Sequence, residues 1–312
     1  MSTSVAIEDI IVDHEFFEGA RKKLQECMDS FGNARKRKCL PIYGPSGSGK
    51  STMIETFLDD YPPIKHETGW ERPVVVVETP SYPTPRSFAS EVLRLQGDPL
   101  YFQGSEVEMT ARIVEFAGIQ KTRLFIFDEL QVLIDRDSAR LNFKTAEWIK
   151  RLINQLKVVP VVIVGLEQVS QLFLANEQVR RRFRSPYFMP SFDWHVKEKR
   201  KILKGFLKAV EENLKLENGL QLSSSEIVFR FYCATNGLVG YIMEIIAEAN
   251  ALASKTHSEE ITREHLAKAY VEVVCGNHLV GVNPFTDDEK DIEKALIVVE
   301  VSLVSKGGRL KK

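Results

Sequence analysis

Residues 44–52 read GPSGSGKST, a spacing that is typical of loops that bind phosphate. In such loops, glycines let backbone N–H groups curl around phosphate oxygens, a lysine reaches the β and γ phosphates, and a hydroxyl ligates Mg²⁺. Lys50 and Ser51 are the lysine and the hydroxyl residue of this pattern. We therefore expect ATP and Mg²⁺ to bind here. The expected nucleotide-binding residues are Gly44, Pro45, Ser46, Gly47, Ser48, Gly49, Lys50, Ser51 and Thr52.

Two adjacent carboxylates, Asp128 and Glu129, follow the apolar run at residues 124–127. At the end of a buried strand, one carboxylate is suited to hold Mg²⁺ and its neighbour to polarise the water that attacks the γ-phosphate. We expect Asp128 to hold the metal together with Ser51, and Glu129 to act on the water. Kinases share the glycine-rich loop but do not need an adjacent Asp-Glu pair. The second motif therefore favours hydrolysis of ATP to ADP and phosphate.

A run of arginines lies at residues 178–184, which read QVRRRFR. In many ATPases, an arginine from a neighbouring subunit neutralises the charge that develops on the γ-phosphate. Arg182, directly before Phe183, is the predicted catalytic arginine, with Arg181 and Arg184 as the next candidates. A basic surface cluster is the alternative interpretation. If Arg182 does complete a neighbour's site, the active form is an oligomer.

Runs of β-branched and aromatic residues predict the strands that carry these motifs, at 39–43, 73–78, 123–128 and 158–165. Helical patterns accompany them at 51–58, 88–95, 106–119, 143–156 and 167–175. Unbroken apolar strands that alternate with helices are typical of a parallel sheet covered on both faces. We therefore predict a three-layer α/β domain of the P-loop class over residues 39–190.

Beyond residue 190 the strand signals stop. Helical patterns at 195–215, 223–235, 238–255 and 262–275 predict a small all-helical lid domain over 191–275. Upstream, apolar residues at helical spacing predict an amphipathic helix within 5–33, in an N-terminal segment of residues 1–38. Residues 276–312 are the predicted C-terminal tail.

The composition limits the number of domains and the kinds of protein that the chain can be. The 312 residues suffice for about two domains at roughly 150 residues each. The net charge of −1 gives no bulk attraction to polyanions, so a nucleic-acid contact requires local patches. The four cysteines share no C-x-x-C spacing, which argues against a zinc site and a disulfide framework. No signal peptide or membrane span is apparent, so we expect a soluble, cytoplasmic protein.

The chain resembles the AAA+ ATPases of transposition systems, the TniB and TnsC family, and more distantly MuB. The resemblance covers most of residues 8–275 and rests on GPSGSGKST, FIFDELQ, VVIVGLEQ, RRRF and ATNGLVGYIMEII. It implies an AAA+ core followed by a helical lid, in a bacterial regulator of transposition that assembles as a ring or helical filament on target double-stranded DNA. It also implies recruitment of a transposase of the TnsB/TniA type, a target selector of the TniQ type, and release on ATP hydrolysis.

Two positions depart from the AAA+ pattern. Many AAA+ proteins sense the γ-phosphate with a lid arginine, and residues 237–241, GLVGY, contain none. The fourth predicted strand also ends without the asparagine or threonine of a first sensor. We expect Glu167 or Gln168 to substitute there.

Loops that follow the second core strand and the acidic strand line the inner surface of AAA+ rings. Contacts from basic side chains to phosphates give an affinity that depends on salt and is indifferent to sequence. Tyr82 lies in the first of these loops. The basic candidates are Arg86, Lys121, Arg123, Arg136, Arg140 and Lys144. A solvated surface charge is the alternative for each.

Two other functions stay open. In the first, bound ATP stabilises an assembly and is hydrolysed only slowly; the missing lid arginine favours this alternative. The chain can also be a replication initiator or loader. Such proteins commonly append a winged-helix domain of about 80 residues, whereas residues 276–312 are too few for one.

Overall fold

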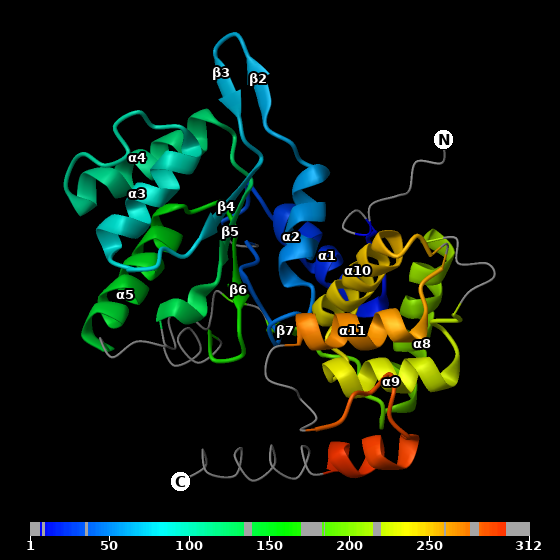
Figure 1. The fold of residues 1–312 in the computed structure, drawn as a ribbon. Coiled ribbons are helices and arrows are strands. Elements are labelled where there is room, and N and C mark those ends of the chain that lie inside the picture. Colours follow the sequence, from blue (N-terminus) through cyan, green and yellow to red (C-terminus); the bar gives the residue numbers. More distant parts are fainter. Residues whose placement is uncertain are drawn as a thin grey trace. The chain divides into compact units, whose positions relative to one another are not determined.

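The computed structural model describes residues 10–34, 37–133, 139–169, 185–214, 220–258, 260–274 and 281–297, together with Ile7 and Phe183. For residues 139–142 it describes the backbone alone. The chain divides into two compact units (Figure 1). The first is Phe16–Met189, and the second combines Met1–Glu15 with Pro190–Lys312. Each unit is described by itself.

The first unit is built on a five-stranded parallel sheet with the order β4-β5-β6-β1-β7. Its strands are β1 (Leu40–Tyr43), β4 (Val74–Glu78), β5 (Leu124–Asp128), β6 (Val161–Gly165) and β7 (Tyr187–Phe188). The registers pair Glu78 with Asp128, and Tyr43 with Gly165. These strands therefore end at one edge of the sheet, which we call the carboxyl edge. Because β6 lies between β1 and β5, it separates the phosphate loop from the acidic pair.

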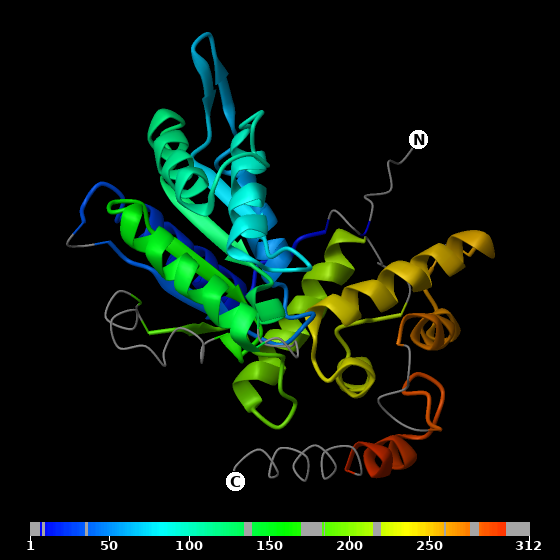
Figure 2. The same cartoon turned by 90° about the vertical axis from the view of Figure 1, so that its left-hand side faces the viewer.

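Helices cover both faces of this sheet, because successive residues of each strand point to opposite faces. Phe125 and Phe127 pack in one core with α3 (Pro85–Gln96), α4 (Glu106–Ile119) and α5 (Ala139–Gln155). Leu124 and Ile126 pack in the other core with α1 (Glu15–Met28) and α2 (Lys50–Asp59). The layers are visible in Figures 1 and 2. The predicted α/β architecture with a parallel sheet is confirmed.

The sequence analysis did not predict a small antiparallel hairpin, formed by β2 (Ile64–His66) and β3 (Gly69–Glu71). It extends beyond the sheet in Figure 1. Its strands have three residues each, and all are exposed except Glu71, which is half-buried. Such strands lack the buried apolar positions that make a strand recognisable, and local pairing across a tight turn forms them instead.

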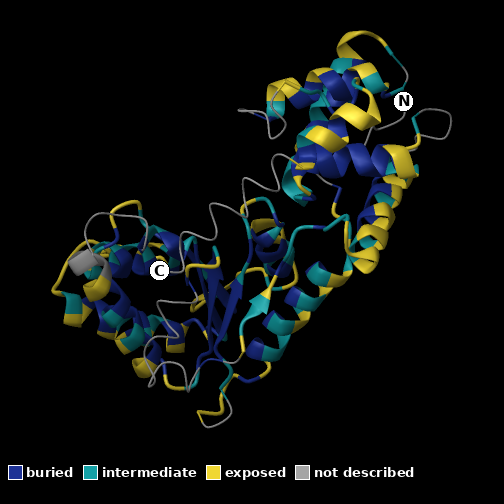
Figure 3. Ribbon diagram, turned by 90° about the horizontal axis from the view of Figure 1, so that it is seen from below, coloured by how far each residue is buried: buried dark blue, intermediate teal, exposed yellow. Residues whose placement is uncertain are grey.

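The second unit contains the helices α8 (Lys197–Asn213), α9 (Ser225–Thr235), α10 (Val239–Lys255) and α11 (Arg263–Val273), at the places where the helical patterns predict helices. In Figure 3, the buried residues of these helices lie on their inner faces, as amphipathic helices require. His14 also belongs to this unit, and its ring packs edge-on against Phe192 at 5.1 Å. The burial that results lowers the pKa of His14 to about 4. The first helix begins only at Glu15, one residue later.

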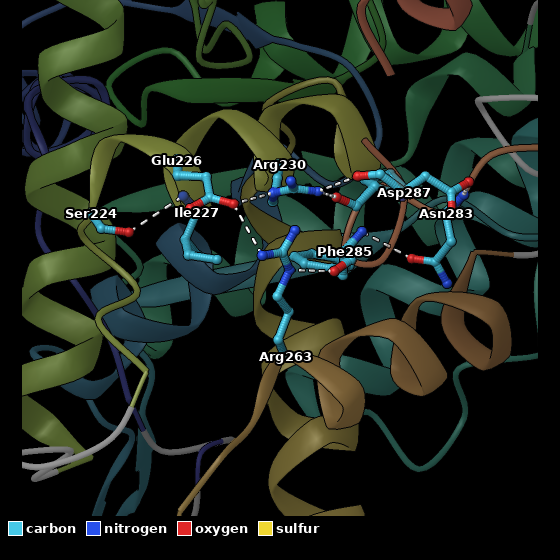
Figure 4. A network of polar contacts seen from close by, with 9 residues as sticks. Ser224, Glu226, Ile227, Arg230, Arg263, Asn283, Phe285 and Asp287 are labelled. Atoms are coloured by element: carbon cyan, nitrogen blue, oxygen red, sulfur yellow. Dashed lines mark hydrogen bonds and ion pairs between the residues drawn. The ribbon is translucent and has the colours of Figure 1, made fainter. Parts of the chain in front are cut away.

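A polar network ties residues 281–297 to the helical unit (Figure 4). Arg230 of α9 is 4% exposed, donates to the Glu226 carboxylate at 3.0 Å and donates to the carbonyl oxygens of Pro284 and Asp287. Arg263 of α11 makes an ion pair with the same carboxylate at 3.1 Å. The network therefore joins α9, α11 and a segment that lies in the predicted tail.

None of the helices in the described part of the chain is long and apolar enough to cross a membrane. Three of the four cysteines, Cys27, Cys39 and Cys233, are described, and all three are buried.

Candidate nucleotide-binding site

The phosphate loop follows β1, and its backbone depends on two glycines. Gly47 and Gly49 have φ angles of +75° and +87°, in the left-handed region that other residues rarely adopt. Gly49 is the N-cap of α2, and its helix start has no hydrogen bond from a capping side chain. The first N–H groups of α2 are thus available to a ligand, and the positive end of the helix dipole favours an anion there. The backbone fits a phosphate.

Gly44, the first residue of the loop, lies in close contact with two neighbouring segments. Its N–H donates to the carbonyl oxygen of Gly165 at 3.2 Å. A Cβ at Gly44 would lie 2.3 Å from the carbonyl oxygen of Met189 and 2.8 Å from the Ser48 hydroxyl. No larger residue fits this position, so a glycine is required to keep the loop against the ends of β6 and β7.

Lys50 is 6% exposed and lies within the loop. Its Nζ donates to the carbonyl oxygens of Gly44 at 3.0 Å and Pro45 at 2.8 Å. Burial lowers the pKa of Lys50, and the charges of Glu129 and Asp128 oppose that change. The charges of both carboxylates therefore act on the ammonium. The structure brings together the lysine and the acids that the sequence predicts for one site.

Ser48 supplies a further observation that favours a ligand. Its Oγ is buried and has no hydrogen-bond partner among the described residues. A buried hydroxyl without a partner is unfavourable, so an oxygen-rich group in the loop would stabilise it. Together with the helix start and Lys50, this hydroxyl fits the phosphates of a nucleotide.

Asp128, the last residue of β5, is 9% exposed. Its Oδ1 accepts the N–H of Glu129 at 2.8 Å, and its backbone carbonyl accepts both the N–H and the hydroxyl of Thr79. Burial raises the pKa of Asp128, while the hydrogen bond from Glu129 and the charge of Lys50 lower it. The carboxylate is thus held firmly in a poorly solvated place, where a cation would stabilise its charge.

The residues present fit Mg²⁺, which commonly binds through one or two protein groups, phosphate oxygens and waters. Asp128 is one such group, and Ser51, exposed in the first turn of α2, is the other. Among the described residues, no group of three or more His, Cys, Asp and Glu side chains is arranged to hold a metal alone. The site thus suits a metal that binds together with the nucleotide.

Replacing Asp128 with asparagine is expected to stabilise the nucleotide-free protein at pH 8, by about 0.5–2 kcal/mol. The pKa of Asp128 is higher in the folded than in the unfolded protein, so the ionised carboxyl destabilises the fold at pH values above both pKa values. The difference should shrink as the pH falls towards the range where both states are protonated. Thermal unfolding across pH measures it, and a lower melting temperature for the variant at pH 8 would contradict the expectation.

Glu129 has a φ angle of +55°, which is uncommon for a residue with a side chain. Its carboxylate accepts a hydrogen bond from Nε2 of Gln131, and Oε1 of Gln131 accepts the N–H of Leu166 at 3.2 Å. Glu167 and Gln168, the sensors proposed from the sequence, are both exposed. Gln131 is therefore the side chain that joins the end of β6 to the acidic pair. Its place in the FDELQ motif was the signal available in the sequence.

Several predicted site residues fall outside the described side chains. Arg136 and the arginine candidates Arg181, Arg182 and Arg184 lie outside the described residues, and Arg140 is described by its backbone alone.

The other basic candidates divide into two places. Arg86 is exposed in the first turn of α3, and Lys144 is exposed on α5. Lys144 lines a surface pocket of about 480 Å³ together with Pro85, which directly precedes Arg86; Glu106, Glu147 and Arg151 line the same pocket. Lys121 precedes β5 at the opposite edge of the sheet, where it pairs with Glu71 at 2.9 Å. The structure thus brings Arg86 and Lys144 to the carboxyl edge and separates Lys121 from them.

Comparison with known proteins is consistent with this geometry. The family described as bacterial TniB protein matches residues 5–193. No curated protein matches the chain.

Solved structures of an ORC1 protein, of Cdc6p and of a Walker-type ATPase are similar in fold. The ORC1 protein of Aeropyrum pernix, solved in complex with DNA, is 18% identical with a TM-score of 0.58; the alignment covers 84% of the present chain and 66% of that protein. Cdc6p of Pyrobaculum aerophilum is 16% identical with a TM-score of 0.60; the alignment covers 96% of the present chain and 82% of Cdc6p. A Walker-type ATPase of Pyrococcus abyssi is 15% identical with a TM-score of 0.56; the alignment covers 96% of the present chain and 77% of that ATPase. At these identities the likeness shows the fold alone, that of the AAA+ P-loop ATPases.

Proposed function

The chain belongs to the bacterial TniB family, and from that premise we propose that it binds and hydrolyses ATP and assembles on double-stranded DNA as a regulator of transposition. The observation that carries the ATPase part is the convergence of Lys50 with Asp128 and Glu129 beside the open start of α2. A phosphate-binding loop beside an isolated carboxylate would favour binding alone. A second carboxylate in a fixed position favours hydrolysis.

Each group in the site has a distinct part in the proposed reaction. Backbone N–H groups at the start of α2 and the Lys50 ammonium bind the phosphates, and Ser51 and Asp128 would hold Mg²⁺. When bound, the metal would supply positive charge that offsets the charge of the phosphates. Glu129 orients the attacking water and accepts its proton. Arg182 of a neighbouring copy neutralises the charge that develops on the γ-phosphate, a role that rests on the arginine pattern of the sequence.

An exposed patch at the carboxyl edge is the proposed DNA contact, formed by Tyr82, Arg86, Phe143 and Lys144. Tyr82 is 79% exposed and Phe143 is 64% exposed, so two aromatic rings accompany the two cations. The hydroxyl of Thr145 donates to the carbonyl oxygen of Pro83 at 2.8 Å, which holds the Tyr82 loop against α5. Cations attract phosphates of any sequence, as a protein that must accept many targets requires.

We expect the double variant Arg86→Ala with Lys144→Ala to bind double-stranded DNA about 10-fold to 100-fold more weakly in the presence of ATP. The slope of log K against log salt should fall by about 2, because two phosphate contacts are lost. Lys22→Ala, which removes an exposed lysine of α1 from the other face of the sheet, is the matched control. Equal DNA affinity and equal salt slopes for the double variant and the control would contradict the proposed patch.

The partners proposed from the family are a transposase of the TnsB/TniA type and a target selector of the TniQ type. In this proposal, ATP holds the oligomer on DNA, the oligomer recruits and stimulates the transposase, and hydrolysis releases it. Mixing the purified protein with DNA, ATP and the transposase encoded beside its gene tests this part. Transposition that proceeds equally without the protein would contradict it.

One observation favours a second candidate function, an ATP-binding assembly module with little turnover. Gly237 lies in the segment where other AAA+ lids carry a sensor arginine. A Cβ added at this position would lie 1.8 Å from the carbonyl oxygen of Phe192. That point of the helical unit has no space for a side chain. Residues 238–241 supply no arginine either, so sensing of the γ-phosphate falls to the core alone.

A further inference from the structure

A chain of hydrogen bonds joins the Glu129 carboxylate to the end of β6. Nε2 of Gln131 donates to the carboxylate, and Oε1 of the same amide accepts the N–H of Leu166 at 3.2 Å. Gln131 is 7% exposed, so water competes little for either bond. An amide has one donating and one accepting end, and here each end has the partner that it requires. The orientation of the Gln131 side chain is therefore fixed.

Gly165 makes room for this amide. A Cβ at Gly165 would lie 2.5 Å from Oε1 of Gln131 and 2.7 Å from a methyl of Val169. β6 therefore ends in glycine at the point where many AAA+ proteins have a polar sensor, and Gln131 reaches that point from the 3₁₀ turn that follows the neighbouring strand, β5. The side chain of Gln131 thus occupies the space that a side chain at position 165 would need.

The peptide group between Gly165 and Leu166 also contacts the phosphate loop. The carbonyl oxygen of Gly165 accepts the N–H of Gly44, and the N–H that follows it, of Leu166, donates to Gln131. A single peptide group at the end of β6 therefore connects the first residue of the phosphate loop to the Glu129 carboxylate. If the phosphate loop moved relative to β6, the hydrogen bonds through Gln131 would change the position of the Glu129 carboxylate.

The backbone at Glu129 has an uncommon conformation. Its φ angle of +55° lies in the left-handed region, which residues with a side chain seldom adopt. The carbonyl oxygen of Glu129 accepts the N–H of Val132 at 3.2 Å, in the short 3₁₀ helix η2 (Leu130–Leu133). That turn brings Gln131 back towards the carboxylate two residues earlier.

We infer that Gln131 is a positioning residue, which sets the Glu129 carboxylate relative to the phosphate loop through the end of β6. The inference rests on the proposed ATPase function and names a residue that determines its rate. Gln131 does not contact the nucleotide in this role. It acts on turnover through the direction of the Glu129 carboxylate.

Two substitutions test the inference. In Gln131→Ala the carboxylate loses its donor, so we expect kcat for ATP hydrolysis to fall on the order of 10²-fold with the Kd for ATP unchanged. Gln131→Glu keeps the shape and an acceptor for Leu166 but places a carboxyl against Glu129. Two adjacent carboxyls share a proton, so the acid limb of the pH–rate profile should move roughly 1–2 units to higher pH. A loss of packing alone would not move that limb.

Gln103→Glu is the matched control, because Gln103 is exposed in the connection between α3 and α4. Its kcat and pH profile should equal those of the unaltered protein. Normal turnover by Gln131→Ala, or an unshifted pH profile for Gln131→Glu, would overturn the inference while leaving the ATPase proposal intact.

Absence of turnover in the unaltered protein would instead overturn the ATPase proposal, and denaturation then tests the contact without activity. The melting temperature of Gln131→Glu should fall relative to the unaltered protein as the pH rises, because an ionised carboxyl at position 131 would repel the Glu129 carboxylate beside it. Gln103→Glu should show no such trend. A Gln131→Glu melting curve that follows the control at every pH would overturn the contact between Gln131 and Glu129.

Discussion

Lys50→Ala is expected to abolish ATP binding and, with it, ATP-dependent assembly on DNA. The buried ammonium is the cation that opposes Asp128 and Glu129 in the site. Its removal leaves the phosphates of an incoming nucleotide facing two carboxylates without the lysine that opposes their charge. Like charges at short range repel, so the variant loses an attraction and gains a repulsion.

Calorimetry with Mg²⁺-ATP and electron microscopy of the protein with DNA measure the two effects. Lys22→Ala removes an exposed lysine from the same unit and should leave both unchanged. Circular dichroism shows whether Lys50→Ala keeps the fold, since the lysine also donates to Gly44 and Pro45. Normal filaments or rings from a folded Lys50→Ala variant would exclude ATP as the organiser of the assembly.

Glu129→Gln is expected to keep ATP binding and to lower hydrolysis by on the order of 10³-fold. The amide preserves the size of the side chain but cannot accept the proton of the attacking water. Because release is proposed to follow hydrolysis, complexes of this variant with ATP and DNA should persist far longer than those of the unaltered protein. Single-turnover kinetics and the lifetime of the DNA complex are the measurements.

Glu115→Gln is the matched control for that variant. Glu115 is an exposed glutamate on α4 of the same unit and is not part of the proposed site. Its neutralisation should change the rate little. Equal and negligible turnover by the unaltered protein, Glu129→Gln and Glu115→Gln would favour the alternative in which ATP only holds the assembly together.

The elements that carry the site are readable in the sequence because their burial is uniform. Every residue of β5 and of β6 is buried, and a strand covered on both faces shows as an unbroken apolar run. The positions of Lys50, Asp128 and Glu129 follow, since parallel strands bring their carboxyl ends to one edge. For this reason the fold and the centre of the candidate site are predictable from local patterns.

Other features depend on contacts that no local pattern records. The β2–β3 hairpin has no buried face, and β7 has only two residues, which pair with β1. Gln131 reaches the end of β6 only because Glu129 adopts a positive φ angle and the 3₁₀ helix turns back. A spacing in the sequence gives the separation of two residues along the chain but not the direction of the side chain.

The buried guanidinium in Figure 4 has a practical consequence for anyone who shortens this protein for study. A version that stops at residue 275, after the last labelled helix, would deprive Arg230 of two backbone acceptors, Pro284 and Asp287. It would also remove the buried ring of Phe285, which packs against Phe231 of α9 and Tyr270 of α11. Because such a version would expose this guanidinium and these apolar rings to water, shortened forms should keep the residues up to 297.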